Sequence, residues 1–182
     1  MKLVQRVIVL AMLCVAMTMS SALPAFATVK WLSTVVPQTQ TKSNWCWAAS
    51  SSMIIKHFGG TASQSSVVNY IYPNQSYPNY TATDSQADKA IDHYQSADTG
   101  NVTATYLSFT AVKYQTNNNG PIYAGWSWVS GGGHATVIRG YDDSGSTYVY
   151  WVNPADGLGH KNTYAWFKND GSHIWDGSIF YK

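Results

Sequence analysis

The chain changes its pattern of apolar residues near residue 120, and this change restricts the folds open to it. Before that point, apolar side chains recur at the three- and four-residue spacing of amphipathic helices. After it, short runs rich in aromatic and β-branched residues are separated by Gly or Asp-Gly turns, which is typical of antiparallel strands. Helices followed by strands, in place of strict alternation, predict an α+β fold.

The expected elements are bounded by capping residues and turns. The first helix starts near Trp45, with Ser43 or Asn44 as its cap, and ends at Gly59-Gly60. An extended lead-in over 28–40 precedes it. The other expected elements are a helix over 64–71, a loop over 72–83, a helix capped by Asp84, a helix over 106–115, and strands over 121–128, 134–141, 147–152 and 174–181, with a hairpin turn at 142–145.

The N-terminus has the three-part layout of a secretory signal peptide. Lys2 and Arg6 form a basic region, an apolar run covers 7–19, and Ala25-Phe26-Ala27 offers small residues before the cleavage site. The apolar run is shorter than the about 20 residues that a membrane-spanning helix needs. We therefore expect a signal peptide over 1–27 and one secreted, monomeric domain over 28–182, without stable membrane association after cleavage.

The charge balance excludes a nucleic-acid partner. Removing Lys2 and Arg6 with the signal peptide leaves nine of the 11 basic residues, which balance the nine acidic ones. No cluster of Lys and Arg remains that could follow a phosphate backbone. The His and Asp residues also lack the spacing of metal ligands, so we expect no metal or other cofactor.

The exported chain would hold a single cysteine, because Cys14 leaves with the signal peptide and Cys46 remains. Exported proteins usually pair their cysteines or lack them, since the compartment is oxidising. An unpaired cysteine there is either buried and inert or reactive. Cys46 lies at the start of the first expected helix, where unpaired N–H groups and the helix dipole stabilise a thiolate. We therefore predict a reactive Cys46 with a lowered pKa.

A reactive thiol needs an imidazole, and the chain offers five histidines: His57, His93, His134, His160 and His173. His134 differs from the others, because Gly131-Gly132-Gly133 precedes it and an apolar strand follows it. The glycines let another backbone or a substrate approach closely. A plain glycine hairpin would show the same pattern. We predict that His134 is the base.

A third group should orient the imidazole. Asn153 ends the strand that follows the hairpin turn, where it can meet His134, and Asp156 is the competing candidate. Simple turn chemistry of the Asn-Pro pair would also explain Asn153. An oxyanion hole completes such sites. Gln40, six residues before Cys46, can donate its side-chain amide there, and Gln38 competes with it.

These motifs together resemble those of papain-like cysteine peptidases. The matching segments are Gln40-Thr-Lys-Ser-Asn-Trp-Cys46-Trp-Ala-Ala, Gly-Gly-His134-Ala-Thr-Val-Ile and Val-Asn153-Pro. Their order and the Gln-to-Cys spacing are those of the family, and the likeness extends from about residue 40 to 181. It is closer to the short bacterial branch of secreted effector and double-glycine leader peptidases. The resemblance implies a two-lobe fold, with Cys46 on a helical half and His134 and Asn153 on a β half.

The chain departs from the family in three ways. Only residues 28–45 separate the expected cleavage site from Cys46, which is too short for the inhibitory propeptide of plant and lysosomal relatives, and their disulfides are absent. Asn153 stands where many bacterial relatives have Asp, so it adds no negative charge. The resemblance implies hydrolysis of polypeptides through a Cys46 thioester. The alternatives are another Cys–His acyl enzyme, such as a cell-wall amidase or a transpeptidase, and a non-catalytic binding module on the same fold.

Overall fold

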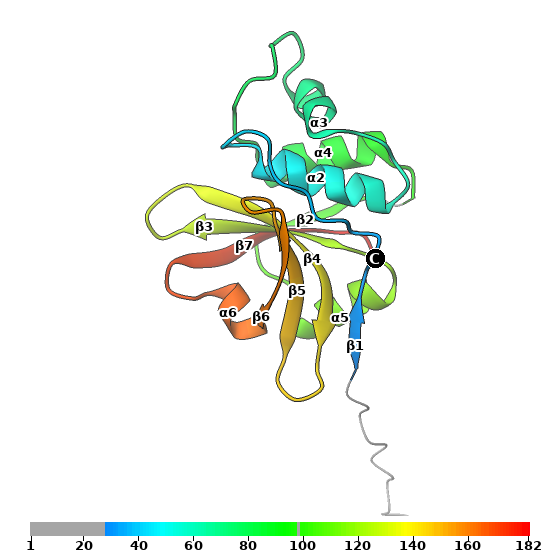
Figure 1. The fold of residues 1–182 in the computed structure, drawn as a ribbon, viewed down its shortest axis with the longest axis vertical. Helices are drawn as coiled ribbons and strands as arrows, with labels where there is room; N and C mark the ends of the chain where they lie inside the picture. Colours follow the sequence, from blue (N-terminus) through cyan, green and yellow to red (C-terminus); the bar gives the residue numbers. More distant parts are fainter. Residues whose placement is uncertain (1–27, 98) are drawn as a thin grey trace, which may run out of the picture.

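An antiparallel sheet, built largely from the second half of the chain, is the centre of the fold (Figure 1). The computed structural model describes residues 28–97 and 99–182, so the predicted signal peptide and Cys14 lie outside the described residues. The strands are β1 (Val29–Trp31), β2 (Asn101–Thr103), β3 (Ile122–Trp128), β4 (Gly133–Asp142), β5 (Tyr148–Asn153), β6 (Leu158–Thr163) and β7 (His173–Phe180). Within the described residues they form a seven-stranded sheet in the order β2-β7-β3-β4-β5-β6, and β1 pairs with β4 outside this path.

The helices lie in two groups on the two faces of this sheet. A layer of α2 (Cys46–His57), α3 (Gln64–Ile71) and α4 (Asp84–Tyr94) lies above the sheet in Figure 1, and α5 (Phe109–Asn117) and α6 (Tyr164–Lys168) lie below it. None of the helices in the described ranges has the length and apolar character needed to cross a membrane.

Alternate residues of the central strands face two separate cores. Tyr123 and Val137 belong to the core beneath α2, whereas Ile122 and Ile138 belong to the core with α5 and α6. Side chains alternate between the two faces of a strand, and here both faces are covered. This explains why β3 and β4 contain nearly continuous apolar runs.

The α+β prediction is confirmed, and most predicted elements are present with shifted ends. The four predicted strands correspond to β3, β4, β5 and β7, and the four predicted helices to α2, α3, α4 and α5. The last of these helices begins three residues later than predicted, because Ser108 caps it by accepting a hydrogen bond from the Ala111 N–H. Thr83, and not Asp84, caps α4, in a capping box with Gln86.

The predicted cap of the first helix is wrong. Trp45 occupies the N-cap position of α2, and no side chain caps the helix. Asn44 binds Asn79 instead: its backbone N–H donates to Asn79 Oδ1 at 3.0 Å, and its Nδ2 donates to the Asn79 carbonyl at 2.8 Å. Ser43 Oγ accepts a hydrogen bond from Asn79 Nδ2 at 2.9 Å. These polar residues therefore hold the loop over 72–83 beside the start of α2.

Four short elements were not predicted: β1, β2, β6 and α6. β6 has the sequence Leu-Gly-His-Lys-Asn-Thr and lies at an edge of the sheet, mostly exposed, so it shows no apolar alternation. β1 and β2 are three residues long and exist through pairing with β4 and β7. The single-turn helix α6 follows Thr163, which caps it by accepting a hydrogen bond from the Trp166 N–H.

Candidate active site

Cys46 is the first residue of α2, and its sulfur lies against β4. Sγ accepts hydrogen bonds from the backbone N–H groups of Ala135, Trp47 and Cys46 itself. Burial raises the pKa of the thiol above its ordinary value of 9.0, because the loss of water disfavours the thiolate more than these N–H groups stabilise it. The prediction of a lowered pKa is therefore wrong. The helix start supplies the expected donors, but the packing around them excludes solvent.

His134 is the second residue of β4, directly before Ala135, and it shares a cleft with Cys46. The cleft has a volume of about 410 Å³. Its walls come from the start of α2, the end of the loop before α4, and strands β3, β4 and β7. Gly132 and Gly133 form part of the wall, as expected from the close approach that glycine allows. Both predicted reactive groups thus line one cleft.

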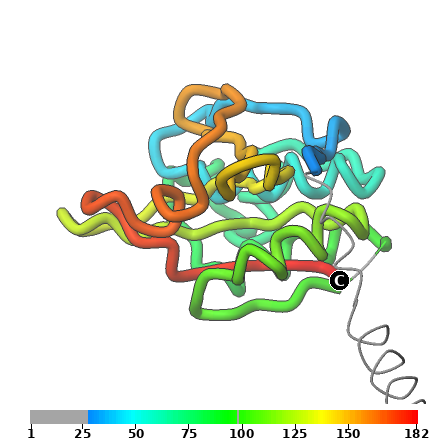
Figure 2. The backbone as a smooth tube through the Cα atoms, turned by 90° about the horizontal axis from the view of Figure 1, so that it is seen from below, coloured from blue at the N-terminus to red at the C-terminus, as the bar shows by residue number. Residues whose placement is uncertain are grey.

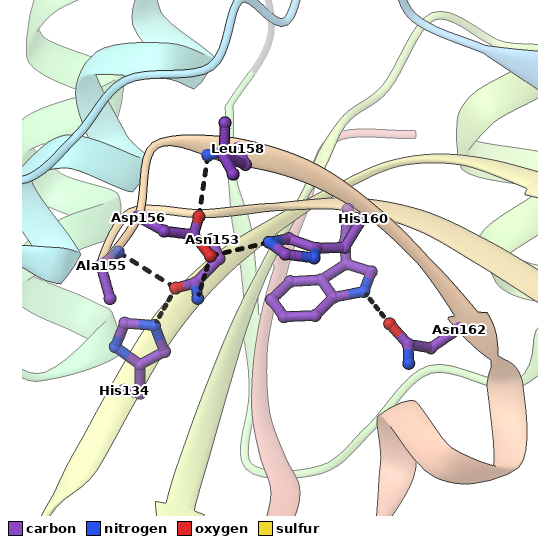
Figure 3. A network of polar contacts seen from close by, with 8 residues as sticks. His134, Asn153, Ala155, Asp156, Leu158, His160 and Asn162 are labelled. Carbon is purple, nitrogen blue, oxygen red and sulfur yellow. Dashed lines mark hydrogen bonds and ion pairs between the residues drawn. The ribbon is translucent and has the colours of Figure 1, made fainter.

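The side chain of Asn153, at the end of β5, contacts the imidazole of His134 (Figure 3). His134 Nε2 and Asn153 Oδ1 are 2.8 Å apart. Because an amide oxygen only accepts hydrogen bonds, Nε2 carries the hydrogen and Nδ1 has a free lone pair. Asn153 Oδ1 also accepts from the Ala155 N–H at 3.0 Å. The structure therefore places Asn153, and not Asp156, against the ring.

Asp156 contacts the Asn153 amide at Nδ2, whereas His134 contacts it at Oδ1. Asn153 Nδ2 donates to Asp156 Oδ2 at 3.2 Å, and the same oxygen is 2.9 Å from His160 Nε2. Asp156 Oδ1 accepts from the Leu158 N–H at 2.8 Å. Burial raises the pKa of Asp156, but the hydrogen bonds from Leu158, His160 and Asn153 outweigh burial, so its pKa is lowered. The carboxylate is therefore ionised at neutral pH.

Burial disfavours the charged form of the His134 imidazole. Burial is the largest effect on its pKa and lowers it, and the nearby His173 lowers it further. The hydrogen bond to Asn153 and the negative charge of Asp156 raise this pKa, but they do not outweigh burial. Burial therefore disfavours the charged form of both groups, which favours a thiol and a neutral imidazole over an ion pair.

Gln40 lies in the lead-in, and its amide group is engaged by the backbone. Nε2 donates to the carbonyls of Lys42 at 2.9 Å and Ser43 at 2.7 Å, while Oε1 is buried without a partner in the described part of the chain. Gln38 points elsewhere, since its Oε1 accepts from Lys56 Nζ of α2 at 3.3 Å. Neither glutamine is among the residues that line the cleft, but Gln40 is the one whose side chain binds the backbone directly before Cys46.

The lead-in also packs against the turn that carries Asn153. The Gln40 N–H donates to the Pro154 carbonyl at 2.8 Å, and Figure 2 shows the blue lead-in beside the orange turn. Gly157 in this turn has φ +70°, and a Cβ there would lie 2.1 Å from Thr39 Oγ1. Only glycine combines this left-handed backbone with so close a neighbour.

The other histidines lie outside the walls of the cleft. His57 contacts Thr34 and the Asn119 carbonyl, and His93 stacks on Tyr70 at 4.0 Å. His173 is buried, stacks on Trp126 at 3.8 Å, and pairs with Asp170 at 2.9 Å. Among the described residues, no group of His, Cys and Asp is arranged to hold a metal ion.

Several cleft residues were not predicted. Trp126 is buried but also lines the cleft, and the ring of Trp128 lies 6.0 Å from that of His134. Asp84 and Asp176 also line it, and burial and the neighbouring Asp176 charge raise the pKa of Asp84. No sequence pattern marks these residues, because they come from strands and a helix far apart in the chain.

Comparison with known families agrees with this site. A family model described as papain-like cysteine protease AvrRpt2 matches residues 30–171, most of the chain. A search of curated proteins found no match. The matched range includes the Cys46, His134 and Asn153 motifs, and the resemblance to a bacterial effector branch is confirmed. The chain therefore belongs to the AvrRpt2 family of papain-like cysteine proteases and is a cysteine-type peptidase that acts on polypeptides.

Proposed function

We propose that residues 28–182 form a secreted peptidase in which Cys46 is the nucleophile, His134 the general base and acid, and Asn153 the group that orients the imidazole. The supporting observation is the 2.8 Å contact between His134 Nε2 and Asn153 Oδ1. It fixes the tautomer that leaves Nδ1 free, on a side chain that shares one cleft with the thiol. A fixed tautomer and orientation are what an imidazole base requires.

The reaction starts from the neutral pair. His134 Nδ1 takes the thiol proton as Cys46 Sγ bonds to the peptide carbonyl carbon, whose oxygen becomes an oxyanion. When the C–N bond breaks, the imidazolium gives its proton to the leaving amine and a thioester remains. His134 then takes a proton from water, the resulting hydroxide attacks the thioester, and the sulfur leaves as thiolate. The imidazolium returns its proton to the sulfur, which restores the resting state.

The oxyanion would be held by the helix-start N–H groups of Cys46 and Trp47, together with Gln40. These N–H groups already surround the sulfur, close to where the carbonyl oxygen of a bound acyl group would lie. Gln40 Nε2 would exchange one of its two backbone carbonyl partners for the oxyanion. Such donors stabilise charge that develops only in the transition state.

The roles of Cys46 and His134 are tested by hydrolysis of casein and a fluorogenic peptide. We expect Cys46→Ala and His134→Ala to lower kcat by about 10⁴-fold or more, because each removes a group that the chemical steps need. The control is His93→Ala, which removes an imidazole stacked on Tyr70 outside the cleft and should keep activity. Full casein hydrolysis by Cys46→Ala would refute the nucleophile. Cleavage of peptidoglycan without cleavage of casein would identify an amidase.

The resting protonation state is tested by alkylation of Cys46 with iodoacetamide, read by intact mass. Because burial raises the pKa of the thiol, the thiolate fraction at neutral pH is small. We therefore expect the alkylation rate to rise with pH in a single step above the ordinary thiol value of 9.0. A rapid reaction well below pH 7 that His134→Ala removes would instead show a thiolate–imidazolium pair. Either result identifies the ionisation from which the reaction starts.

The oxyanion role of Gln40 is tested by comparing Gln40→Ala with Gln38→Ala. Loss of one oxyanion donor lowers kcat by about 10²–10³-fold, with little change in KM. Gln38→Ala removes a neighbouring amide whose contacts are with Ser52 and Lys56, so its kcat should match that of the wild type. Wild-type kcat in Gln40→Ala would show that the backbone N–H groups hold the oxyanion alone.

Secretion is tested by expressing the full chain and collecting the culture medium. We expect the intact mass of the exported protein to correspond to residues 28–182, because the small residues before position 28 form the cleavage site. A protein that stays with the cells, or one that keeps residues 1–27, would contradict a cleaved signal peptide.

A further inference from the structure

The turn after β5 holds an ionised carboxylate, Asp156, whose contacts the proposed reaction does not use. Asp156 does not line the cleft, and neither does Asn153. Its carboxylate is nevertheless connected to the base: it accepts from Asn153 Nδ2, and Asn153 Oδ1 accepts from His134. Figure 3 shows the His134, Asn153, Asp156 and His160 side chains joined in this order by dashed contacts.

We propose that Asp156 is a positioning residue that fixes the amide of Asn153 with its oxygen toward His134 and supplies, through that amide, the negative charge that Asn153 lacks. This inference rests on the proposed role of His134 as the base. It assigns Asp156 no contact with the substrate. His160 and the backbone of Leu158 serve to hold the carboxylate in place.

The amide of Asn153 has one accepting end and one donating end, and Asp156 decides which end faces the ring. An ionised carboxylate only accepts hydrogen bonds, so it selects the Nδ2 end, at 3.2 Å. The opposite flip would place Asn153 Oδ1 against the carboxylate, which is repulsive, and Nδ2 against His134 Nε2. Nε2 would then have to accept, so the hydrogen of the imidazole would move to Nδ1, the atom that the proposed base needs free. The flip shown is also supported by the Ala155 N–H, which donates to Oδ1 at 3.0 Å.

The carboxylate itself is held from two sides. The Leu158 N–H binds Oδ1 at 2.8 Å, and His160 Nε2 lies 2.9 Å from Oδ2. The ring of His160 stacks on Trp151, with centroids 4.8 Å apart. Trp151 is buried and donates through Nε1 to Asn162 Oδ1 at 2.9 Å. Asp156 is thus attached to the rigid core of the sheet, although the carboxylate is partly exposed to solvent.

The charge of Asp156 acts on His134 among several other groups. The titratable groups of the surrounding elements include Cys46 of α2, Asp84 of α4, Tyr123 of β3, His173 and Asp176 of β7, and His160 of β6 behind Asp156. Of these and Asp156, two change the pKa of His134: Asp156 raises it and His173 lowers it. Removal of the Asp156 charge therefore lowers the pKa of His134. An imidazolium that forms in the transition state is stabilised less when this charge is absent.

The test is Asp156→Asn, which keeps the size of the side chain and removes its charge. We expect kcat to fall about three- to tenfold, a modest effect because solvent screens a partly exposed carboxylate, with KM unchanged. Since His134 accepts a proton only when neutral, the acidic limb of kcat/KM should move to lower pH. The pKa of His134, read from its ring protons by NMR in the Cys46→Ala background, should fall as well. The control is Asp143→Asn, at the far β4–β5 turn, where the carboxylate pairs with Lys113.

Two results would overturn the inference: an unchanged kcat and acidic limb in Asp156→Asn, or a loss of activity that is matched by a lower melting temperature and leaves the pKa of His134 unchanged. Failure of the proposed function looks different. In that case His134→Ala would keep its activity, while the NMR titration would still report whether Asp156 acts on the ring.

Discussion

The start of α2 packs against β4, and this contact determines where both reactive groups lie. Cys46 is the first helical residue, and its sulfur accepts the N–H of Ala135, the residue directly after His134. The contact also buries the thiol, and burial raises its pKa. The packing that brings Cys46 close to His134 thus also disfavours ionisation of the thiol. In the proposed reaction the thiol becomes a strong nucleophile only when the imidazole takes its proton, which makes the orientation of His134 decisive.

One segment, the lead-in before α2, connects the parts of the site. Its Gln40 N–H binds the Pro154 carbonyl in the turn that carries Asn153, and Thr39 packs against Gly157 of the same turn. Gln64 at the start of α3 holds the segment from the other side, since it donates to the Thr39 carbonyl at 2.8 Å. The segment of the candidate oxyanion group and the turn that carries Asn153 are therefore joined by a backbone hydrogen bond and by close packing.

Much of this arrangement could be predicted from the sequence, because local patterns carry it. The spacing of apolar residues separates helices from strands, and the glycines before His134 and the Asn-Pro pair mark strand ends. Three things could not be predicted. The polar edge strand β6 has no apolar pattern, the cap of α2 is absent because Asn44 binds Asn79, and the pKa of Cys46 depends on burial by distant elements. Each depends on contacts between segments that are far apart in the chain.

The position of negative charge in the site follows from the cost of burying it. A carboxylate at position 153 would lie directly against a partly buried imidazole, where it would lose hydration. Asn153 makes the same contact through a neutral oxygen, and the charge is carried by Asp156, which remains partly exposed and bound by Leu158 and His160. Through the Asn153 amide, Asp156 fixes which end of the amide faces the imidazole, because the donating and accepting ends cannot be exchanged. The amide transmits charge only partly, because distance and solvent weaken the field. An Asn at this position is therefore consistent with an active base, provided that a carboxylate stands behind it.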